Sequence, residues 1–395
     1  MFRHRKVDCA FSAEKYQAVP DVFLKRSSSY STGDLSKLGG PIPRANRPLQ
    51  ESCRNPESKS GKKAFESGKR LIRACIAAPS RSNIASMDMT GPILPDAFRN
   101  RVLQMHGDTG ACWLDGLPEL ISNLSDTWAL SVGSPFDLSY NYVAPARGPD
   151  GESLVLKIAV SGDRQIAREA AALMRVSDSC SVRLVTFDGS HGAMLTERAM
   201  PGDSLSVLAD RSDHAASEAI GEIFECIWNT SPDATDTSLS SVMEETFLPS
   251  LQLPESINLA QLELIEGARV ILRRLSLEAE ESTFLHGDLH HGNLLSAQRS
   301  PWLMIDPKAM VGERCFDVAG YVISPLRSST ETPNRRELMV NRSTVLAGQL
   351  GLDPSRILSW AFIRAVAAEL WNIEDHGTQM GTGFQLAETL EEIIG

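Results

Sequence analysis

The sequence predicts an α+β protein with two lobes, a small antiparallel β-sheet lobe that carries one helix and a larger, mainly helical lobe. Two observations predict this fold class. Between about residues 128 and 200, short runs alternate apolar and polar residues, as strands with one buried face do. After Pro201 the apolar residues recur at helical spacing over long segments. We therefore expect one bilobed fold with a cleft between the lobes.

The first lobe, together with the helices that precede it, is assigned to residues 87–198. Turn sequences such as GPDG and DGSHG separate its strands and favour hairpins, which pair antiparallel. We expect strands at Trp128–Val132, Leu138–Ala144, Ser153–Ala159, Val182–Phe187 and Ala193–Glu197. We expect helices at Asp96–His106, Leu117–Leu124 and, inserted among the strands, Arg164–Arg175.

The second, helical lobe is assigned to residues 199–395. Its long segments place apolar residues three and four positions apart, which favours helices with one buried face. A compact pair of short strands, around residues 293–295 and 302–305, interrupts the helices. We expect the helices at Asp213–Asn229, Asn258–Glu278, Asn334–Leu350 and Pro354–Ile373.

Residues 1–86 differ in composition from the rest of the chain. They hold 17 Lys and Arg against 7 Asp and Glu, whereas residues 87–395 hold 22 against 43. The segment is rich in Ser, Pro and Gly and has few periodic apolar positions, so we expect it to be disordered. A short basic amphipathic helix at residues 62–76 is an alternative. Met87 or Met89 is an alternative natural start, which an intact mass from the native source tests.

Composition also restricts the partners and the compartment. The sequence has no apolar run long enough to cross a membrane, and its first residues do not resemble a secretory signal. Its seven cysteines are scattered, without a CxxC pair, so we expect reduced thiols in the cytoplasm. We expect neither nucleic acid nor a membrane as a partner, and the oligomeric state stays open.

The segment from His286 to Asp306, HGDLHHGNLL followed by MIDP, carries the chemistry. Asn293 lies five residues after Asp288, the interval found between the catalytic aspartate and the metal-binding asparagine of kinases. Asp306 follows an apolar strand and provides a second carboxylate. Amide and carboxylate oxygens suit Mg²⁺, so we predict Asp288 as the catalytic residue and Asn293 and Asp306 as metal ligands. Zinc bound by the histidines is an alternative, but no HExxH or CxxC supports it.

Two lysines are candidates for binding the phosphates of ATP. Residues 87–395 contain only Lys157 and Lys308 and otherwise use arginine, which indicates that a compact charge is needed at these positions. Lys157 lies in the strand SLVLKIA, and Glu169 on the following helix can pair with it, as a strand lysine and a helix glutamate do in kinases. For Lys157 and for Glu169, the alternative is an exposed, solvated side chain.

The segment MLTERAMPG, residues 194–202, connects the two lobes. An adenine ring between lobes can form hydrogen bonds with such a connector, so we predict that Glu197 and Ala199 contact the nucleotide through their backbones. The glycine-rich loop of protein kinases is missing, because SVGSPFDLSYNYVA holds one glycine. This absence argues against a strict protein-kinase assignment.

These stretches resemble the aminoglycoside phosphotransferase family, and more closely its streptomycin 6-phosphotransferase and hydroxyurea phosphotransferase branch. The resemblance spans about residues 128 to 376 and is most specific in HGDLHHGN and in IDPK with the following VGE and FD. It implies a protein-kinase-like fold that uses ATP and Mg²⁺. It gives Asp288, Asn293, Asp306 and Lys157 the roles stated above, and Asp317 a structural one. The basic N-terminal segment has no counterpart in the family.

The acidic balance of residues 87–395 favours a cationic small molecule as the acceptor, such as an aminoglycoside. The candidate contacts are Glu313, Glu369, Trp371, Glu374 and Asp375. Three functions stay open: a kinase for streptomycin or a related antibiotic, a kinase for another small metabolite or hydroxyurea, and a nucleotide-binding pseudokinase. The intact set around Asp288 argues against the pseudokinase, since a protein that only binds nucleotide does not need that aspartate.

Overall fold

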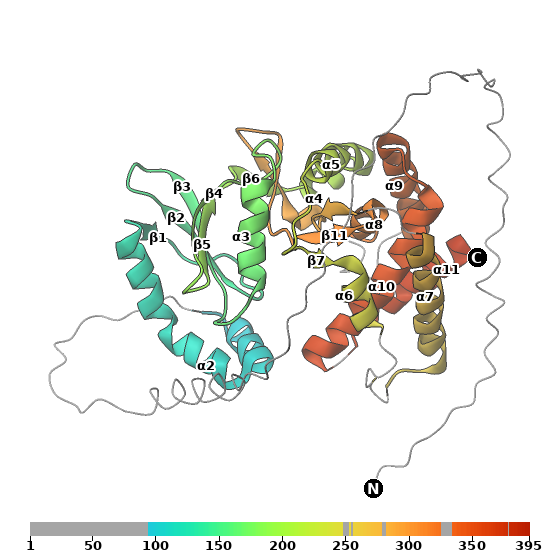
Figure 1. Ribbon diagram of the computed structural model, residues 1–395, viewed down its shortest axis with the longest axis horizontal. Helices are drawn as coiled ribbons and strands as arrows, with labels where there is room; N and C mark the ends of the chain where they lie inside the picture. The colour runs from blue at the N-terminus through green and yellow to red at the C-terminus, as the bar shows by residue number, and fades with distance from the viewer. Residues whose placement is uncertain (1–93, 248–252, 254–255, 279–281, 325–333, 378) are drawn as a thin grey trace, which may run out of the picture. The chain divides into compact units, whose positions relative to one another are not determined.

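The structure is a computed structural model that describes residues 94–247, 253, 256–278, 282–324, 334–377 and 379–395 (Figure 1). The predictions for residues 1–86, including the alternative start, lie outside the described residues. Within the described part the fold is α+β, with an antiparallel sheet followed by a mainly helical region, as the sequence predicted. No helix in the described ranges combines the length and the apolar character that a membrane span requires.

An antiparallel sheet in the strand order β1-β2-β3-β5-β4 forms the core of the first lobe. Buried and partly exposed side chains alternate along β2 and β3, which explains why the period of two was visible in the sequence. The central strand β3 is bonded on both sides, so its backbone is held firmly in place. The strands are β1 (Ser131–Val132), β2 (Tyr142–Arg147), β3 (Ser153–Ile158), β4 (Leu184–Asp188) and β5 (Ala193–Glu197).

Strand β2 begins later than predicted, and it also ends later because it continues through Pro145. Proline cannot donate a hydrogen bond, which normally ends a strand. Here the carbonyl of Pro145 faces away from β3 and accepts from the backbone N–H of Gly133, at 2.8 Å. The nitrogen of Pro145 faces the same side, so its missing N–H removes no bond to β3.

Two helices cover opposite faces of this sheet (Figure 1). α2 (Asp96–Thr127) packs side chains such as Phe98 and Trp113 against one face. The sequence predicted two helices here, and the structure joins them across a kink at Gly107, where φ is 52°. α3 (Gln165–Arg175) packs against the other face, on which Met194 lies. Lys157 alternates with the buried residues that face α2 and therefore points toward α3.

α10 (Pro354–His376) is the central helix of the second lobe and packs against α7, α8, α9 and α11. Its side chains from Ile357 to Leu370 are all buried, since neighbouring helices surround it. Asp353 caps its first turn by accepting from the backbone N–H of Ser355, at 2.9 Å. The other helices are α4 (Ser206–Ala209), α5 (Asp213–Trp228), α6 (Leu239–Thr246), α7 (Leu259–Glu278), α8 (Arg314–Val322), α9 (Arg335–Leu350) and α11 (Thr382–Ile394).

Two three-stranded sheets, β10-β9-β6 and β7-β11-β8, support the segment that carries HGDLHHGN. The sequence predicted only the β9–β10 hairpin and missed β6, β7, β8 and β11. The strands are β6 (Pro201–Ser204), β7 (Thr237–Ser238), β8 (Thr283–Leu285), β9 (Leu294–Ala297), β10 (Trp302–Met304) and β11 (Met310–Gly312).

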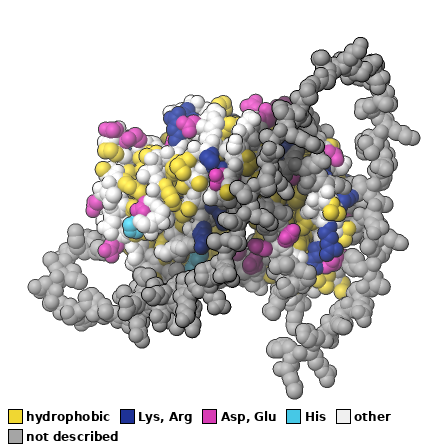
Figure 2. All heavy atoms as spheres, in the orientation of Figure 1, with side chains coloured by type: hydrophobic (Ala, Val, Ile, Leu, Met, Phe, Trp, Pro, Cys, Tyr) yellow, Lys and Arg dark blue, Asp and Glu magenta, His cyan; other side chains and the backbone are white. Residues whose placement is uncertain are grey.

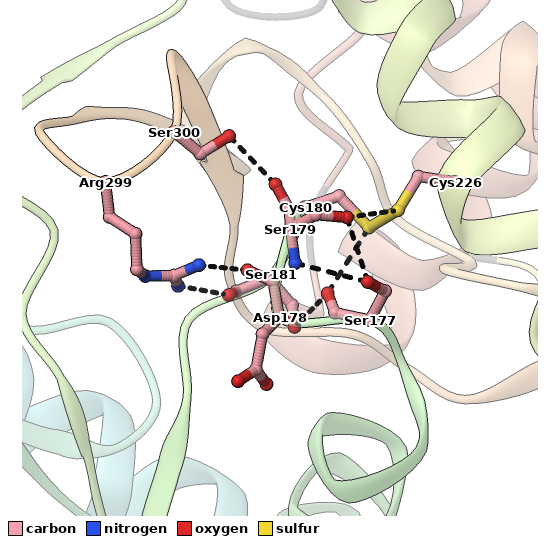
Figure 3. Close-up of a disulfide and its surroundings, with 8 residues drawn as sticks. All are labelled: Ser177, Asp178, Ser179, Cys180, Ser181, Cys226, Arg299 and Ser300. Atoms are coloured by element: carbon pink, nitrogen blue, oxygen red, sulfur yellow. Dashed lines mark hydrogen bonds between the residues drawn. A yellow bond between two sulfur atoms is a disulfide. The ribbon is translucent and has the colours of Figure 1, made fainter.

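A disulfide joins Cys180, in the segment after α3, to Cys226 on α5 (Figure 3). The expectation of reduced thiols is therefore wrong for this pair. The two residues are 46 positions apart in sequence, and packing of the segment onto α5 brings their Cα atoms within 6.4 Å. No local spacing motif marks such a pair. Among the described cysteines, Cys112 and Cys315 are free thiols.

Charged side chains of both signs share the surface. On the face shown in Figure 2, Asp and Glu side chains lie interspersed with Lys and Arg side chains and with hydrophobic ones. The described side chains visible on this face therefore do not form a purely acidic patch.

Candidate active site

Helix α8 binds the backbone of the loop from His286 to Asp288 through hydrogen bonds. The buried carboxylate of Asp317 accepts from the backbone N–H groups of His286, at 2.9 Å, and Gly287, at 2.7 Å. Gly287 has a φ of +85°, and a Cβ atom there would lie 2.6 Å from the Sδ of Met310. A side chain at this position would be strained and would collide with Met310, so the turn that presents Asp288 requires glycine.

His286 braces the same loop with both nitrogens of its ring. Its Nε2 donates to the carbonyl of Ile305, at 2.9 Å, and its Nδ1 accepts from the backbone N–H of Asp288, at 3.2 Å. Burial lowers the pKa of His286 to about 4, so the imidazole is neutral, as this donor and acceptor pattern requires. Both nitrogens are occupied, which rules His286 out as a zinc ligand. His291 packs its ring on Tyr321, with centroids 4.5 Å apart.

The side chain of Asp288 is partly exposed and lies close to a buried arginine. Its side chain is 32% exposed, and its Oδ1 lies 3.5 Å from the Nη2 of Arg364, which is buried in α10. Arg364 also donates to the backbone carbonyls of Gly287, at 3.1 Å, and Phe316, at 3.3 Å. The guanidinium thus holds both the loop and the carboxylate. Sequence reasoning missed Arg364, although a charged residue in the middle of an apolar helix is a signal for it.

The β9–β10 hairpin brings Asn293 and Asp306 to the same loop. The amide nitrogen of Asn293 donates to the carbonyl of Asp288, at 3.0 Å, and its backbone carbonyl accepts from the N–H of Ile305. The amide oxygen is therefore the group left for a ligand. Asp306 adopts a left-handed conformation with a φ of 59°, which aspartate tolerates. Asn293 and Asp306 thus offer an amide and a carboxylate oxygen from two segments joined by the backbone bond between Ile305 and Asn293, a set of donors that suits Mg²⁺.

Lys157 connects the two lobes at this point. Its Nζ lies 2.6 Å from the Oε2 of Glu169 and 2.9 Å from the Oδ1 of Asp306. The Nζ of Lys308 contacts the other oxygen of Asp306, at 3.1 Å. The structure therefore brings together six of the predicted residues, namely Asp288, Asn293, Asp306, Lys157, Lys308 and, behind Lys157, Glu169.

The ionisation of this cluster follows from burial and charge. Burial raises the pKa of Glu169 to about 7, against the opposing effect of Lys157. Burial would lower the pKa of Lys157, but the two carboxylates outweigh it and hold that pKa above its usual value. Burial would also raise the pKa of Asp306, and the two lysines outweigh it in the other direction. The site thus keeps an ionised carboxylate and a protonated lysine in contact near neutral pH.

The connector residues Glu197 and Ala199 are placed differently from one another. The backbone N–H of Glu197 donates to the carbonyl of Arg183, at 2.8 Å, and is not available to an adenine ring. The carboxylate of Glu197 binds Arg299, whereas the sequence analysis assigned that side chain no role. Ala199 is buried within the connector.

Comparison with known proteins agrees with this geometry. The family described as aminoglycoside/hydroxyurea antibiotic resistance kinase matches residues 128–376. The chain belongs to this kinase family. A hydroxyurea phosphotransferase from Kitasatospora aureofaciens is 30% identical over 278 residues, which cover 69% of this chain and 78% of the relative. A streptomycin 6-kinase from Streptomyces griseus is 28% identical over 287 residues, which cover 71% and 91%. The protein is thus a small-molecule phosphotransferase with a hydroxyl group as acceptor.

Solved structures confirm the kinase-like fold of this family member. The choline kinase LicA from Streptococcus pneumoniae has a TM-score of 0.53 at 15% identity, covering 70% of this chain and 98% of that one. The aminoglycoside phosphotransferase APH(4)-Ia, in a ternary complex with ADP and hygromycin B, has a TM-score of 0.51 at 14% identity, covering 69% and 97%.

Two of the predicted acceptor contacts do not fit that role. Glu313 is buried and forms an ion pair with Arg356 through both carboxylate oxygens. Glu369 is fully buried and accepts from the backbone N–H groups of Gly381, at 2.6 Å, and Gly383, at 3.0 Å. Both carboxylates serve the packing of the helical lobe. Their burial and internal pairing argue against direct contact with an acceptor, and the position of neither residue in the sequence revealed that burial.

The remaining predicted contacts lie on the last part of α10. The Nε1 of Trp371 donates to the Oγ1 of Thr246, at 3.0 Å, and its ring packs against the core. Glu374 is exposed, and Asp375 is partly exposed.

Asp375 has an aromatic neighbour from the first lobe. The hydroxyl of Tyr140 lies 3.5 Å from its Oδ2. Burial and then the charge of Asp375 raise the pKa of Tyr140, against the opposing effect of Arg101, whose guanidinium lies 5.8 Å from the centroid of the ring. Sequence reasoning missed Tyr140, because the contact joins positions that are 235 residues apart.

Proposed function

We propose that this protein transfers the γ-phosphoryl group of ATP, with Mg²⁺, to a hydroxyl of a cationic aminoglycoside such as streptomycin, and so provides antibiotic resistance. One observation carries the proposal. Lys157 on the sheet lobe and Asn293 and Asp306 on the β9–β10 hairpin meet beside Asp288. Phosphoryl transfer needs this combination of a cation, oxygen ligands for a metal and a carboxylate near the acceptor.

Asp288 orients the acceptor hydroxyl and takes its proton as the phosphoryl group is transferred. Its partial exposure leaves room for an acceptor, and Arg364, 3.5 Å from its Oδ1, favours one orientation of the carboxylate. Since most of the catalysis in this reaction class comes from positioning and electrostatics, a carboxylate with a fixed direction is the property that matters.

Asp306 and the amide oxygen of Asn293 would hold Mg²⁺, which neutralises charge on the phosphates when it is bound. Lys157 and Lys308, which contact the two oxygens of Asp306, supply the fixed positive charge for the phosphates. Glu169 keeps Lys157 extended toward this position. Because ATP is a cytoplasmic phosphoryl donor, we place the activity in the cytoplasm.

The acceptor is proposed to lie against Asp375 and Tyr140. The carboxylate of Asp375 suits an amino or guanidino group carried on a sugar ring, and the ring of Tyr140 already takes one guanidinium, that of Arg101, at 5.8 Å. The similarity to streptomycin 6-kinases over most of their length supports this class of acceptor. Hydroxyurea is the second candidate, because the hydroxyurea phosphotransferase is similar at 30% identity. Hydroxyurea is uncharged and does not need the Asp375 carboxylate.

A coupled ADP-release screen tests the proposal. It covers streptomycin, other aminoglycosides, hydroxyurea and small amino sugars, with Asp288→Asn as the control for background ATP hydrolysis. Turnover of streptomycin that falls in Asp375→Asn supports the proposed acceptor site. Turnover of hydroxyurea alone selects the second candidate. Absence of acceptor-dependent ADP release across the whole panel would refute both.

A further inference from the structure

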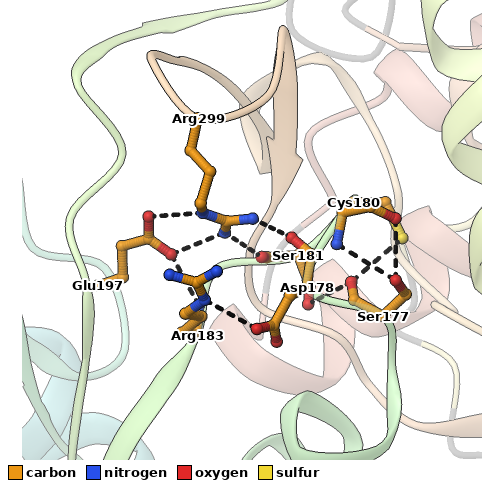
Figure 4. Close-up of polar contacts among 8 residues, drawn as sticks. Ser177, Asp178, Cys180, Ser181, Arg183, Glu197 and Arg299 are labelled. Atoms are coloured by element: carbon orange, nitrogen blue, oxygen red, sulfur yellow. Dashed lines mark hydrogen bonds and ion pairs between the residues drawn. The ribbon is translucent and has the colours of Figure 1, made fainter.

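Arg299 lies between the two segments proposed to hold the metal. It sits in the turn of the β9–β10 hairpin, which begins directly after Asn293 and ends two residues before Asp306. The guanidinium of Arg299 forms two bonds with the carboxylate of Glu197, from Nε to Oε1 at 3.0 Å and from Nη2 to Oε2 at 2.7 Å (Figure 4). The hairpin is thus tied to the last residue of β5.

The same guanidinium reaches a third segment, the one between α3 and β4. Its Nη2 donates to the carbonyl of Ser181, at 2.9 Å, and its Nη1 donates to the carbonyl of Asp178 (Figure 4). The neighbouring Ser300 donates to the carbonyl of Ser179, at 2.8 Å (Figure 3). Backbone bonds between Met304 and the residues on either side of Ser181 complete this docking. A planar, five-donor group suits a junction of this kind, whereas lysine does not.

Burial and charge indicate that the pair is more than a surface contact. The side chains of Arg299 and Glu197 are 23% and 24% exposed, whereas those of the adjacent Arg183 and Asp178 are 53% and 59% exposed. Burial raises the pKa of Glu197, but Arg299 and then Arg183 outweigh it, so the carboxylate stays ionised and the pair charged.

Glu197 is also connected to the phosphate side of the site. It ends β5, which pairs with β3 so that Glu197 lies opposite Leu154 and Met194 lies opposite Lys157. One ion pair therefore joins the strand beside Lys157 to the hairpin that carries Asn293 and Asp306. The distance between these two parts determines whether Lys157 reaches Asp306.

We propose that Arg299 and Glu197 are positioning residues. Their ion pair forms a strut that sets the spacing between the connector, residues 194–202, and the β9–β10 hairpin beside Asn293 and Asp306. The strut acts on ATP through Lys157 and Asp306 and does not touch the acceptor. This inference rests on the proposed function, since it presupposes that ATP binds at Lys157 and Asp306.

The test compares Arg299→Gln and Glu197→Gln with Arg183→Gln. Arg183 is a matched control, because its guanidinium forms its hydrogen bond with Asp178, whereas Glu197 accepts from its backbone N–H, which the substitution keeps, and otherwise feels only its charge. Both strut variants are expected to raise the KM for ATP about ten-fold, because each loses charge-assisted hydrogen bonds. The KM for the acceptor and the kcat are expected to stay within about two-fold, and the control within about two-fold throughout.

Three further measurements distinguish a strut from a general loss of stability. The double variant Glu197→Gln/Arg299→Gln should raise the KM for ATP no further than Arg299→Gln alone, since both changes break one pair. Arg299→Lys should recover only part of the affinity. Titration calorimetry with ATP should show the same order of affinities without turnover.

Two results would overturn the strut. The first is a KM for ATP in both strut variants that matches Arg183→Gln. The second is a parallel loss of ATP affinity, acceptor affinity and kcat, which is the pattern of partial unfolding. If the unmodified protein itself does not bind ATP, the proposed function fails and the strut fails with it. If the unmodified protein binds ATP and the variants do so equally well, the strut alone fails.

Discussion

Replacing Lys157 with methionine separates the structural role of this lysine from its catalytic one. The Nζ of Lys157 lies 2.6 Å from the Glu169 carboxylate, and the two side chains are 11% and 4% exposed. Methionine fills a similar volume but leaves that carboxylate buried without a cation. Removing one partner of a buried ion pair costs about 3–5 kcal/mol. Because burial already raises the pKa of Glu169 to about 7, the carboxylate can take up a proton. We therefore expect Lys157→Met to lower the free energy of unfolding by about 3 kcal/mol, the lower end of that range.

The catalytic loss has a separate origin and size. Lys157→Met removes a fixed positive charge from the phosphates, which reduces kcat by about 10²–10³-fold for a single preorganised group. Asp306 keeps its contact with Lys308, so the metal side of the site stays paired. The double variant Lys157→Met/Glu169→Gln removes the buried charge as well. We therefore expect it to recover most of the stability and none of the activity.

Urea denaturation gives the free energy of unfolding, and a coupled ADP-release assay gives kcat, for both variants and for Glu169→Gln alone. The reasoning is refuted if Lys157→Met retains kcat within about ten-fold, since the lysine would then not serve the phosphates. It is also refuted if Glu169→Gln fails to restore stability in the double variant, because the cost would then not come from the buried carboxylate.

Three other predictions concern Arg364, His286 and the disulfide between Cys180 and Cys226. Arg364→Gln should lower kcat about 10- to 100-fold with the KM for ATP unchanged, because Arg364 orients the base and not the nucleotide; a raised KM for ATP with normal kcat contradicts this. The ring of His286, whose pKa burial lowers to about 4, should show no NMR titration between about pH 8 and 5. Since its folded-state pKa lies below the unfolded value, its contribution to stability is present above about pH 6.5 and is lost as pH falls toward 4; an inflection near 6.5 contradicts this. Cys226→Ser should lower the free energy of unfolding by about 2–4 kcal/mol without reductant, because Cys180 and Cys226 close a 46-residue loop; an unchanged denaturation midpoint contradicts it.

The sequence predicted the parts of the site that lie close together in the chain. Asp288 and Asn293 share one loop, and Asp306 follows the hairpin that this loop begins, so their spacing carried the information. Lys157 was visible through the alternation of its strand and the rarity of lysine in residues 87–395. Each of these signals comes from a local pattern that a functional loop or strand imposes.

The sequence did not predict contacts between distant segments where one partner lies outside a motif, nor the burial of single side chains. Arg299 meets Glu197 across 102 positions, and Arg299 lies in no motif. Glu369 lies on α10, which is buried on all sides around this position. The helix therefore has no exposed polar face from which the burial of Glu369 could be read. Such features depend on how elements pack, which a periodic pattern does not specify.

The most direct test of the central claim measures phosphorylated streptomycin by mass spectrometry, together with ADP, in the unmodified protein and in Asp288→Asn. The account predicts one ADP for each phosphoryl group transferred. It also predicts a loss of about 10³-fold or more in kcat for Asp288→Asn, with ATP affinity preserved. Full transfer activity in Asp288→Asn, with any acceptor that the unmodified protein uses, would contradict the assignment of Asp288 as the base and of this loop as the active site.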